Sequence, residues 1–493
     1  MPLRPKAATT AAGLALVLGF TVFRPPATPG PLERDFEAYY AAGVTVNAGS
    51  DPYSRAIWDA EKRVPGVPAT RDELLPFVGP AAALPFWSLV ARLPYGTALA
   101  VWTALLVAAL LGVLAAALRV ARAPRDPWLY AGAAILAIGS GPVIGALALG
   151  QAALIAAAGV AAAVVAYRAR GAAAAFGSTL LAALQPNLAL ALGARMRSGW
   201  DFAVAASAAG TFIVLTLTAG GGVAGLLTYL HRLAAHGAAE RHVTIQHTPE
   251  AIAYSLGLPL HAAAVLGTTV AVAAAGAAIA LIIRERLDPT DATLVVCALL
   301  PLAIPFVHEH DLVLELLPVL VLALRAHGRT RALASIAAVL VLVDWFGFAQ
   351  RHGAGGQIVC LGTAVALGFA GLNQRKASRD AAPDLYGLAA LAALAALALP
   401  LGLANPAPTW PDALPPAFHA DPAADASAVW AAEGRAAGLT ARQAAWGALR
   451  SIPLAGCCVL AAALVIDARR RRVPALRGQL RKTRAPRYSR TAW

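Results

Sequence analysis

The sequence predicts an all-α protein that crosses a membrane many times, and two observations carry this prediction. Hydrophobic side chains make up 59% of the 493 residues, charged side chains only 13%, and the mean hydropathy is +0.65. Soluble domains carry roughly 25% charged residues, so a water-soluble enzyme or regulator of this composition could not cover its surface. Apolar stretches comparable to the roughly 20 residues of a spanning helix also recur along the whole chain.

These apolar runs give the expected membrane elements in chain order. The run 128–167 is too long for one helix, and glycines and a proline interrupt it, so we expect two helices joined near Gly150. We expect the first run to be a retained anchor helix rather than a cleaved signal peptide. The runs are 7–23, 93–118, 128–167, 171–194, 202–230, 261–283, 292–307, 311–324, 332–343, 353–374, 385–409 and 451–466.

Basic residues between the runs set the orientation, because cytoplasmic loops of membrane proteins carry an excess of Lys and Arg. All basic turns can be cytoplasmic only if the run 171–194 does not cross. Pro186 sits in the middle of that run and cannot donate to a helix ladder, so we predict a re-entrant hairpin there. The expected topology is about twelve crossings plus this hairpin, with both termini cytoplasmic. The basic positions used are Arg4, Lys6, Arg119, Arg122, Arg125, Arg168, Arg170, Arg195, Arg197, Arg284, Arg286, Arg325, Arg329, Arg331, Arg375, Lys376, Arg379 and Arg469 to Arg472.

This topology divides the chain into a core and two smaller parts. The core is 1–403, with 24–92 as the first outer loop, and 404–446 is a second outer loop. The last membrane helix and a basic cytoplasmic tail occupy 447–493. The formal net charge of +14 is concentrated at the cytoplasmic ends, so we expect the tail to contact anionic membrane lipids and not nucleic acid.

The first outer loop holds the first candidate residues for chemistry. A helix continuing to about Asn47 places Asp35 and Tyr39 on one face, four residues apart. After a turn at 49–53, a second short helix over 54–63 carries Arg55, and an amphipathic helix around Trp87 is expected to lie in the outer interface. Asp35 can also be read as an acid that complements the dipole at the start of its helix.

Four consecutive titratable residues, His308, Glu309, His310 and Asp311, form a second outer cluster between two apolar helices. Three interpretations stay open at this point. The turn can be polar because it is wet, the histidines can contribute to a metal site, or a histidine can bind a phosphate at the membrane surface.

The quoted segments together resemble glycosyltransferase family 87, whose members are GT-C-fold membrane mannosyltransferases that use a polyprenyl-phosphate sugar. Asp35-Phe36, Tyr39-Tyr40 and 49–53 resemble the family's opening. Gly150-Gln151 matches its Gly-Gln pair, Gln185-Pro186 stands where the family has Lys-Pro, and the turn at 308–311 resembles its His-rich outer turn. The resemblance covers roughly 14–325. It departs at Gln185 and at 78–80, where Val-Gly-Pro replaces Tyr-Pro-Pro.

The resemblance implies roles for individual residues. Asp35 stands where the family has its catalytic base, which takes the proton of the acceptor hydroxyl. His308 and His310 are the expected partners of the donor phosphate, and Gln151 and Gln185 of sugar hydroxyls. The predicted substrate-binding residues are His308, His310, Asp311, Gln151, Arg55, Tyr39 and Gln185. No cofactor is expected, and the use of a divalent metal stays open.

The sequence thus predicts a GT-C-like hexosyltransferase in the cytoplasmic membrane, with its active site on the extracytoplasmic face. Its expected partners are a polyprenyl-phosphate sugar, with mannose as the expected sugar, and a lipid or glycan acceptor. The alternative is a polytopic transporter or flippase of a lipid-linked or amphipathic substrate. Such a protein would require charged residues near the midplane and internal repeats, whereas the polar residues here gather at the outer edge.

Overall fold

The computed structural model describes residues 34–65, 67, 75–123, 127–326, 329–346 and, with short gaps, 393–484. All regular elements in this part are helices, and one isolated antiparallel bridge joins Gln246 to His308. The predicted anchor helix 7–23 and the run 353–374 lie outside the described residues, and most of 385–409 does too. The all-helical prediction is therefore confirmed for the part that the structure describes.

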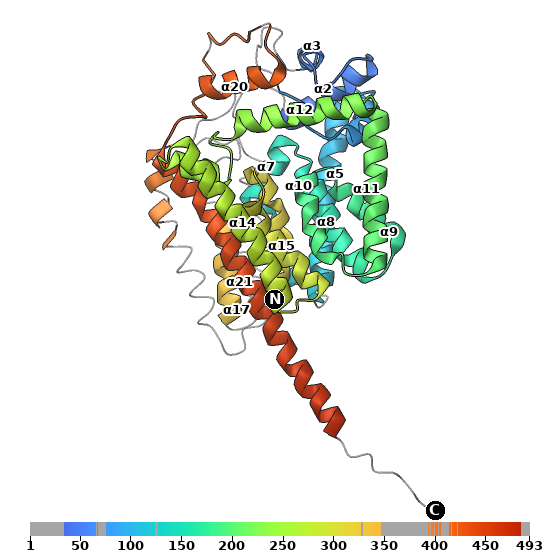
Figure 1. Ribbon diagram of the computed structural model, residues 1–493, viewed down its shortest axis with the longest axis vertical. Helices are drawn as coiled ribbons and strands as arrows, with labels where there is room; N and C mark the ends of the chain where they lie inside the picture. The colour runs from blue at the N-terminus through green and yellow to red at the C-terminus, as the bar shows by residue number, and fades with distance from the viewer. Residues whose placement is uncertain are drawn as a thin grey trace, which may run out of the picture.

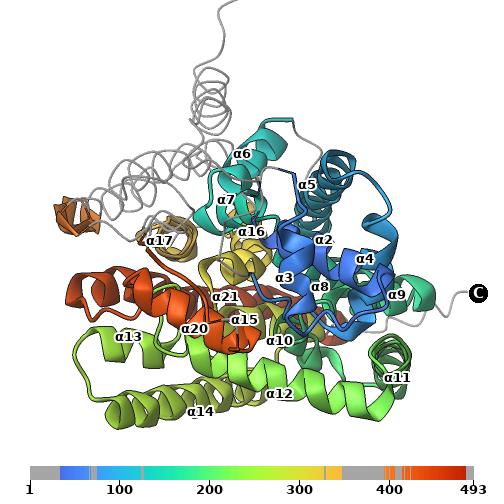
Figure 2. The same cartoon turned by 90° about the horizontal axis from the view of Figure 1, so that it is seen from above.

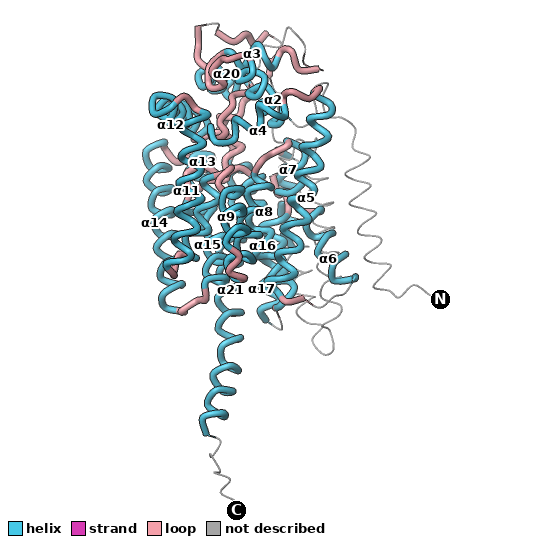
Figure 3. The backbone as a smooth tube through the Cα atoms, turned by 90° about the vertical axis from the view of Figure 1, so that its right-hand side faces the viewer, coloured by secondary structure: helices cyan, strands magenta, loops and turns pink. Residues whose placement is uncertain are grey.

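Short helices of the first outer loop gather at one end of the molecule (Figures 1 and 3). They are α2 (Arg34–Asn47), α3 (Ala56–Glu61), the 3-10 turn η1 (Ala81–Ala83) and α4 (Leu84–Val90). Phe36 of α2 is fully buried and stacks on Trp102, with ring centroids 6.1 Å apart. A Cβ on Gly43 would lie 2.1 Å from the Trp87 carbonyl oxygen, so only glycine allows α2 and α4 to pack this closely.

Four helices in the described part are long and apolar enough to cross a membrane, or five if one bent pair counts as a span. They are α5 (Tyr95–Ala121), α11 (Gly199–Ala219), α14 (Leu260–Arg284) and the first 29 residues of α21 (Ala444–Arg484). Shorter apolar helices are α8 (Ala153–Arg168), α15 (Pro289–Ala303), α16 (Leu316–Arg325) and α17 (Arg329–Leu342). The structure thus shows a polytopic membrane protein, and the count of about twelve crossings is not confirmed.

The run 128–167 forms three helices, where the sequence predicts two. The bent pair consists of α6 (Pro127–Ile138) and α7 (Gly141–Leu149), which meet at 62° and precede α8. Ser140 adopts an extended conformation and Pro142 occupies the first turn of α7, so the helix restarts there. The expected break near Gly150 is present as well, because Gly150 takes a left-handed φ of 71°.

The segment after α8 has the form of the predicted hairpin. It consists of α9 (Ala172–Ala182), α10 (Pro186–Ala189) and the 3-10 turn η2 (Leu190–Arg195), with Gln185 in extended conformation at the bend. The Arg195 guanidinium lies 5.6 Å from the ring of Tyr167, near the end of α8. Both ends of the hairpin therefore lie at the same end of the molecule, and Gln185 stands at its tip.

The run 202–230 is not one crossing, which corrects the sequence prediction. Helix α11 ends at Ala219, Gly221 adopts a left-handed φ of 83°, and α12 (Gly222–Glu240) begins there. Helix α12 lies across the end that the sequence predicts to be the outer one, called the outer end below, and it runs nearly perpendicular to α11 (Figures 1 and 2). One face of α12 is apolar and the other is polar. The apolar side chains of Val223 and Leu227 are exposed, as expected of a helix in the membrane interface.

Ion pairs tie three helices together at the opposite end, which the sequence predicts to be cytoplasmic. Arg325 of α16 lies 2.9 Å from Asp291 of α15 and 2.7 Å from Asp467 of α21. Arg471 lies 2.7 Å from Asp291 and 3.0 Å from Asp467. Arg325 and Arg471, which the predicted topology assigns to the cytoplasmic side, thus lie together at the end from which α21 projects (Figure 1).

Candidate active site

A cavity of about 1470 Å³ begins among the helices of the outer end and continues between the membrane helices. This volume exceeds the roughly 300–1,000 Å³ of ordinary small-molecule sites. Its polar residues come from α2, α12, the 3-10 turn η3 (Glu309–Glu315), the hairpin tip and α20 (Ala426–Ala436). The polar lining residues that matter below are Asp35, Tyr39, Gln151, Gln185, Asn187, His236, Glu240, His308, His310, Asp311 and Trp430.

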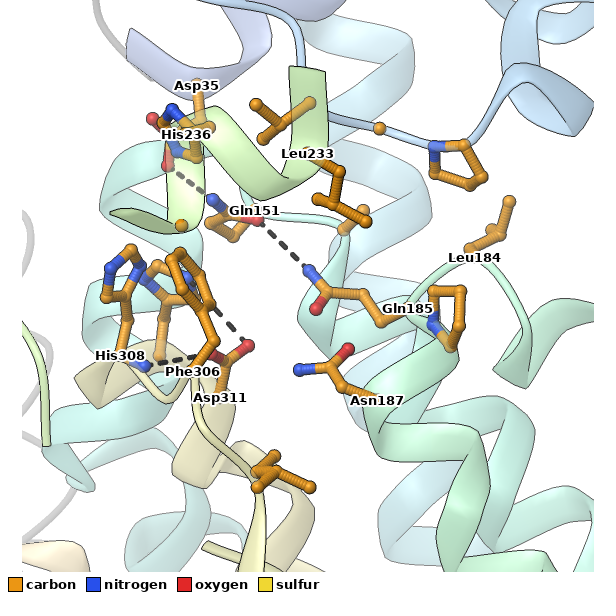
Figure 4. Close-up of a pocket in the computed structure, with 18 of the residues that line it drawn as sticks. Asp35, Gln151, Leu184, Gln185, Asn187, Leu233, His236, Phe306, His308 and Asp311 are labelled. Atoms are coloured by element: carbon orange, nitrogen blue, oxygen red, sulfur yellow. Dashed lines mark hydrogen bonds and ion pairs between the residues drawn. The ribbon is translucent and has the colours of Figure 1, made fainter. Parts of the chain in front are cut away.

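Asp35 stands at the head of a chain of hydrogen bonds (Figure 4). Gln151 Nε2 donates to Asp35 Oδ2 over 2.7 Å, and the Tyr39 hydroxyl donates to Gln151 Oε1 over 2.9 Å. Gln185 Nε2 reaches the same oxygen at 3.5 Å. Because both donors occupy its oxygen, the Gln151 amide must present its NH₂ group to Asp35, which fixes the orientation of this carboxylate.

Sequence motifs far apart in the chain explain this convergence. Asp35 and Tyr39 lie one turn apart on α2, as predicted, and Tyr39 is held by stacking on Trp87 at 4.7 Å. Gln151 follows the left-handed Gly150 that ends α7, and Trp102 Nε1 donates to the Gly150 carbonyl over 2.7 Å. Burial and the charge of Asp35 both raise the pKa of Tyr39, so its phenol remains a donor at neutral pH.

A second cluster of polar side chains surrounds Glu240, which is only 2% exposed. His308 Nε2 lies 3.0 Å and Gln246 Nε2 3.2 Å from Glu240 Oε2. Trp430 Nε1 donates to Glu240 Oε1 over 2.6 Å, and His236 Nε2 lies 3.4 Å from the same oxygen. These four neighbours bring together α12, the loop after it, the turn at η3 and the outer helix α20.

The charges in this group follow from burial and from these contacts. Burial favours the neutral acid, but His236 and His308 outweigh it and lower the pKa of Glu240 to about 2. Burial also favours a neutral imidazole, but Glu240 outweighs it and raises the pKa of His308. Burial and the neighbouring His308 lower the pKa of His310 well below its ordinary value. His308 is therefore the imidazole best placed to carry positive charge at the cavity wall.

Ligand atoms of His308, His310 and Asp311 lie within 4.8 Å of one another, a spacing that a metal ion can use. In this arrangement His308 Nε2 is directed at Glu240, and Asp311 Oδ2 accepts the His308 amide over 2.9 Å. Both side chains thus already have protein partners. We interpret the cluster as the polar end of the cavity and assign no metal to it.

Most of the rest of the cavity wall is apolar and belongs to the membrane helices, although Arg241, Thr248 and Glu250 also line the cavity. Helices α5, α8 and α9 supply one part, and α11 and α14 supply another part. Alanine and glycine are frequent on these faces, a composition that permits close packing of membrane helices. The apolar lining residues of these helices include Leu105, Ala108, Ala109, Gly112, Ile155, Ala158, Ala162, Gly177, Leu180, Leu181, Leu184, Phe212, Leu215, Ala271 and Val272.

Seven of the eight residues singled out from the sequence line this cavity, and Arg55 does not. Arg55 donates to the carbonyl oxygens of Asp421 and Ala424 at 3.2 and 3.4 Å, and its guanidinium lies 4.5 Å from the Trp58 ring. It therefore holds the second outer segment against α3. The structure does not bring it to the other candidates.

Sequence reasoning missed Asn187, His236, Glu240, Gln246 and Trp430. Asn187 follows Pro186 at the hairpin tip and points toward the cavity (Figure 4). Its place beside Gln185-Pro186 could have identified it as a candidate from the sequence. His236 and Glu240, at i and i+4 on an amphipathic stretch, were hidden by the expectation that the preceding run crosses the membrane. The contact between Glu240 and Trp430 joins residues 190 positions apart, and no local pattern predicts it.

The described part of the chain defines a helical protein with several candidate membrane spans, whose polar side chains meet at one end of a large and mostly apolar cavity. The model of glycosyltransferase family 87 matches residues 77–305, which confirms the predicted resemblance and indicates a membrane glycosyltransferase. The match includes Gln151, Gln185 and Glu240, and ends just before His308. Neither the curated proteins nor the solved structures contain a match to this chain.

Proposed function

We propose that this protein transfers a hexose, with mannose as the expected sugar, from a polyprenyl phosphate to a lipid or glycan acceptor on the outer face of the cytoplasmic membrane. One observation carries the proposal. A positioned carboxylate and a histidine with a raised pKa line the same cavity, and the part of the cavity between the membrane helices is largely apolar and large enough for a lipid chain.

Asp35 acts as the general base in this proposal. The acceptor hydroxyl oxygen forms a bond to the anomeric carbon of the sugar while its proton passes to the Asp35 carboxylate. The bond from the anomeric carbon to the phosphate oxygen breaks, and its electron pair leaves with the polyprenyl phosphate. The Gln151 amide orients Asp35 through the 2.7 Å hydrogen bond and stays in place during the step.

His308 binds the donor phosphate, on which negative charge grows as the bond to the sugar breaks. A cationic donor at that point stabilises the transition state more than the ground state. Gln185 and Asn187, at the hairpin tip, are placed to hydrogen-bond sugar hydroxyls between the two polar groups (Figure 4). The polyprenyl chain occupies the apolar part of the cavity.

The test is transfer of labelled mannose from polyprenyl phosphate to a membrane-lipid extract by the purified protein in nanodiscs. Asp35→Asn keeps the size of the side chain and loses its basicity, so we expect transfer to fall by about 10² or more. Asp59→Asn on the exposed side of α3, outside the cavity, is the matched control and should transfer normally.

Thermal unfolding of the same samples separates chemistry from folding. We expect Asp35→Asn to melt near the wild-type temperature. Wild-type transfer by this variant would overturn the role of Asp35, and absence of transfer by the wild type with every lipid fraction would favour the transporter alternative.

A further inference from the structure

The surroundings of Glu240 ask for an explanation beyond the proposed roles of Asp35 and His308. Glu240 ends α12 and is almost completely buried, yet four side chains converge on its two oxygens, two from nearby positions in the chain and two from distant ones. A buried carboxylate is costly unless its charge is matched by partners. Four partners are more than a carboxylate would need if its only role were to end an interfacial helix.

The contacts of Glu240 bear directly on His308. The carboxylate lies 3.0 Å from Nε2, a hydrogen-bonding distance, and the Gln246 amide nitrogen lies 3.0 Å from the same ring nitrogen. The other groups that influence the charge of His308 are Asp311, on the same turn, and Asp35, on α2. Glu240 makes the largest favourable contribution of the three, since it raises the pKa of His308 both through its charge and through the hydrogen bond.

We propose that Glu240 is a positioning residue for His308: its carboxylate fixes the imidazole ring through Nε2 and supports its positive charge, so that His308 binds the phosphate of the lipid donor. This inference rests on the proposed function. The arrangement resembles the way a carboxylate orients a working histidine in enzymes generally, where the partner of one ring nitrogen decides what the other side of the ring can do.

Glu240 also connects this site to the outer segment that lies beyond the family match. Trp430 of α20 donates to Glu240, and Arg232 of α12 lies 3.0 Å from Asp425 at the start of α20. A substitution at Glu240 can therefore act on His308 or on the attachment of α20. The experiment must distinguish these two effects.

The experiment compares two probes, a polyprenyl phosphate and the uncharged polyprenol of the same length, by equilibrium binding to the full-length protein in nanodiscs. Glu240→Gln keeps the size and one carbonyl oxygen for Trp430, and it removes the charge that supports His308. We expect affinity for the polyprenyl phosphate to fall at least about tenfold, with affinity for the polyprenol unchanged. His308→Ala should show the same selective loss, and adding Glu240→Gln to it should weaken binding no further.

Glu285→Gln is the control, because Glu285 pairs with Arg469 at the opposite end of the molecule and should bind both probes normally. Selective loss in His308→Ala together with unchanged binding in Glu240→Gln would overturn the inference and leave the proposed function standing. An equal loss for both probes in Glu240→Gln would also overturn it, because that result indicates disturbed packing of α20. If His308→Ala itself fails to distinguish phosphate from alcohol, the proposed phosphate-binding role is wrong.

Discussion

At the scale of single residues, orientation matters as much as identity. Gln151 is a common polar residue, but two donors on its oxygen oblige its NH₂ group to face Asp35. A chain of this kind strengthens each bond within it and makes the loss of one member felt by the next. The Tyr39 hydroxyl donates to Gln151, which in turn donates to Asp35, so Tyr39 can influence the carboxylate through the Gln151 amide.

The substitution Tyr39→Phe tests this chain. It removes the hydroxyl that donates to Gln151 and keeps the ring that stacks on Trp87. A hydrogen bond of this type contributes about 1 kcal/mol, so kcat should fall about fivefold with little change in melting temperature. The matched variant is Tyr40→Phe, whose hydroxyl donates to the Leu93 carbonyl away from the chain. Equal kcat values for the two variants would show that the Tyr39 hydroxyl does not act through Gln151.

At the scale of elements, the breaks between helices position the site. Helix α7 is short because Pro142 and Gly150 bound it, and this puts Gln151 beside Asp35. The hairpin places Gln185 at its tip, where the Gln185 amide lies 3.5 Å from the Gln151 side-chain oxygen. Helix α12 can lie across the outer end only because the chain turns sharply at Gly220-Gly221, and that turn brings Glu240 over the cavity.

We expect Gly221→Ala to destabilise the protein by about 1–2 kcal/mol, the approximate cost of a left-handed conformation for an L-residue. A methyl group there would meet nothing within 4 Å, so the loss would come from the backbone alone. Gly210→Ala within α11 also meets no neighbour, but it lies in regular helix and should be neutral or stabilising. Thermal unfolding in one detergent compares the two, and equal melting temperatures would contradict the role of Gly221 in the turn.

At the scale of the whole molecule, the sequence predicted the fold class better than the boundaries of the helices. The composition and the apolar runs were enough to predict a polytopic helical protein, because each averages over many residues and no single position decides it. Asp35, Gln151 and Gln185 were identified through short motifs, and the structure places them in one cavity. Glu240 and Trp430 were missed because their contact depends on how two distant outer segments pack. The break at Gly220-Gly221 was missed because the run remains apolar across it.

Topology can be tested on the whole chain with single cysteines in a background where the four native cysteines are replaced by alanine. Ser50→Cys, in the turn after α2, should react with a membrane-impermeant maleimide added outside intact cells. Ala169→Cys, exposed just after α8, should react only after the membrane is opened. Labelling of Ser50→Cys only in opened membranes would reverse the orientation and place the proposed chemistry on the wrong face.

The apolar continuation of the cavity between the membrane helices also determines how rates should be measured. A substrate whose chain lies in that space reaches Asp35 by diffusing within the bilayer, in two dimensions, so the bulk solution is not its reservoir. The quantity that governs occupancy is then the mole fraction of donor among the surrounding lipids. Diluting the donor with inert phospholipid at constant total donor should lower the rate, whereas adding buffer should leave it unchanged.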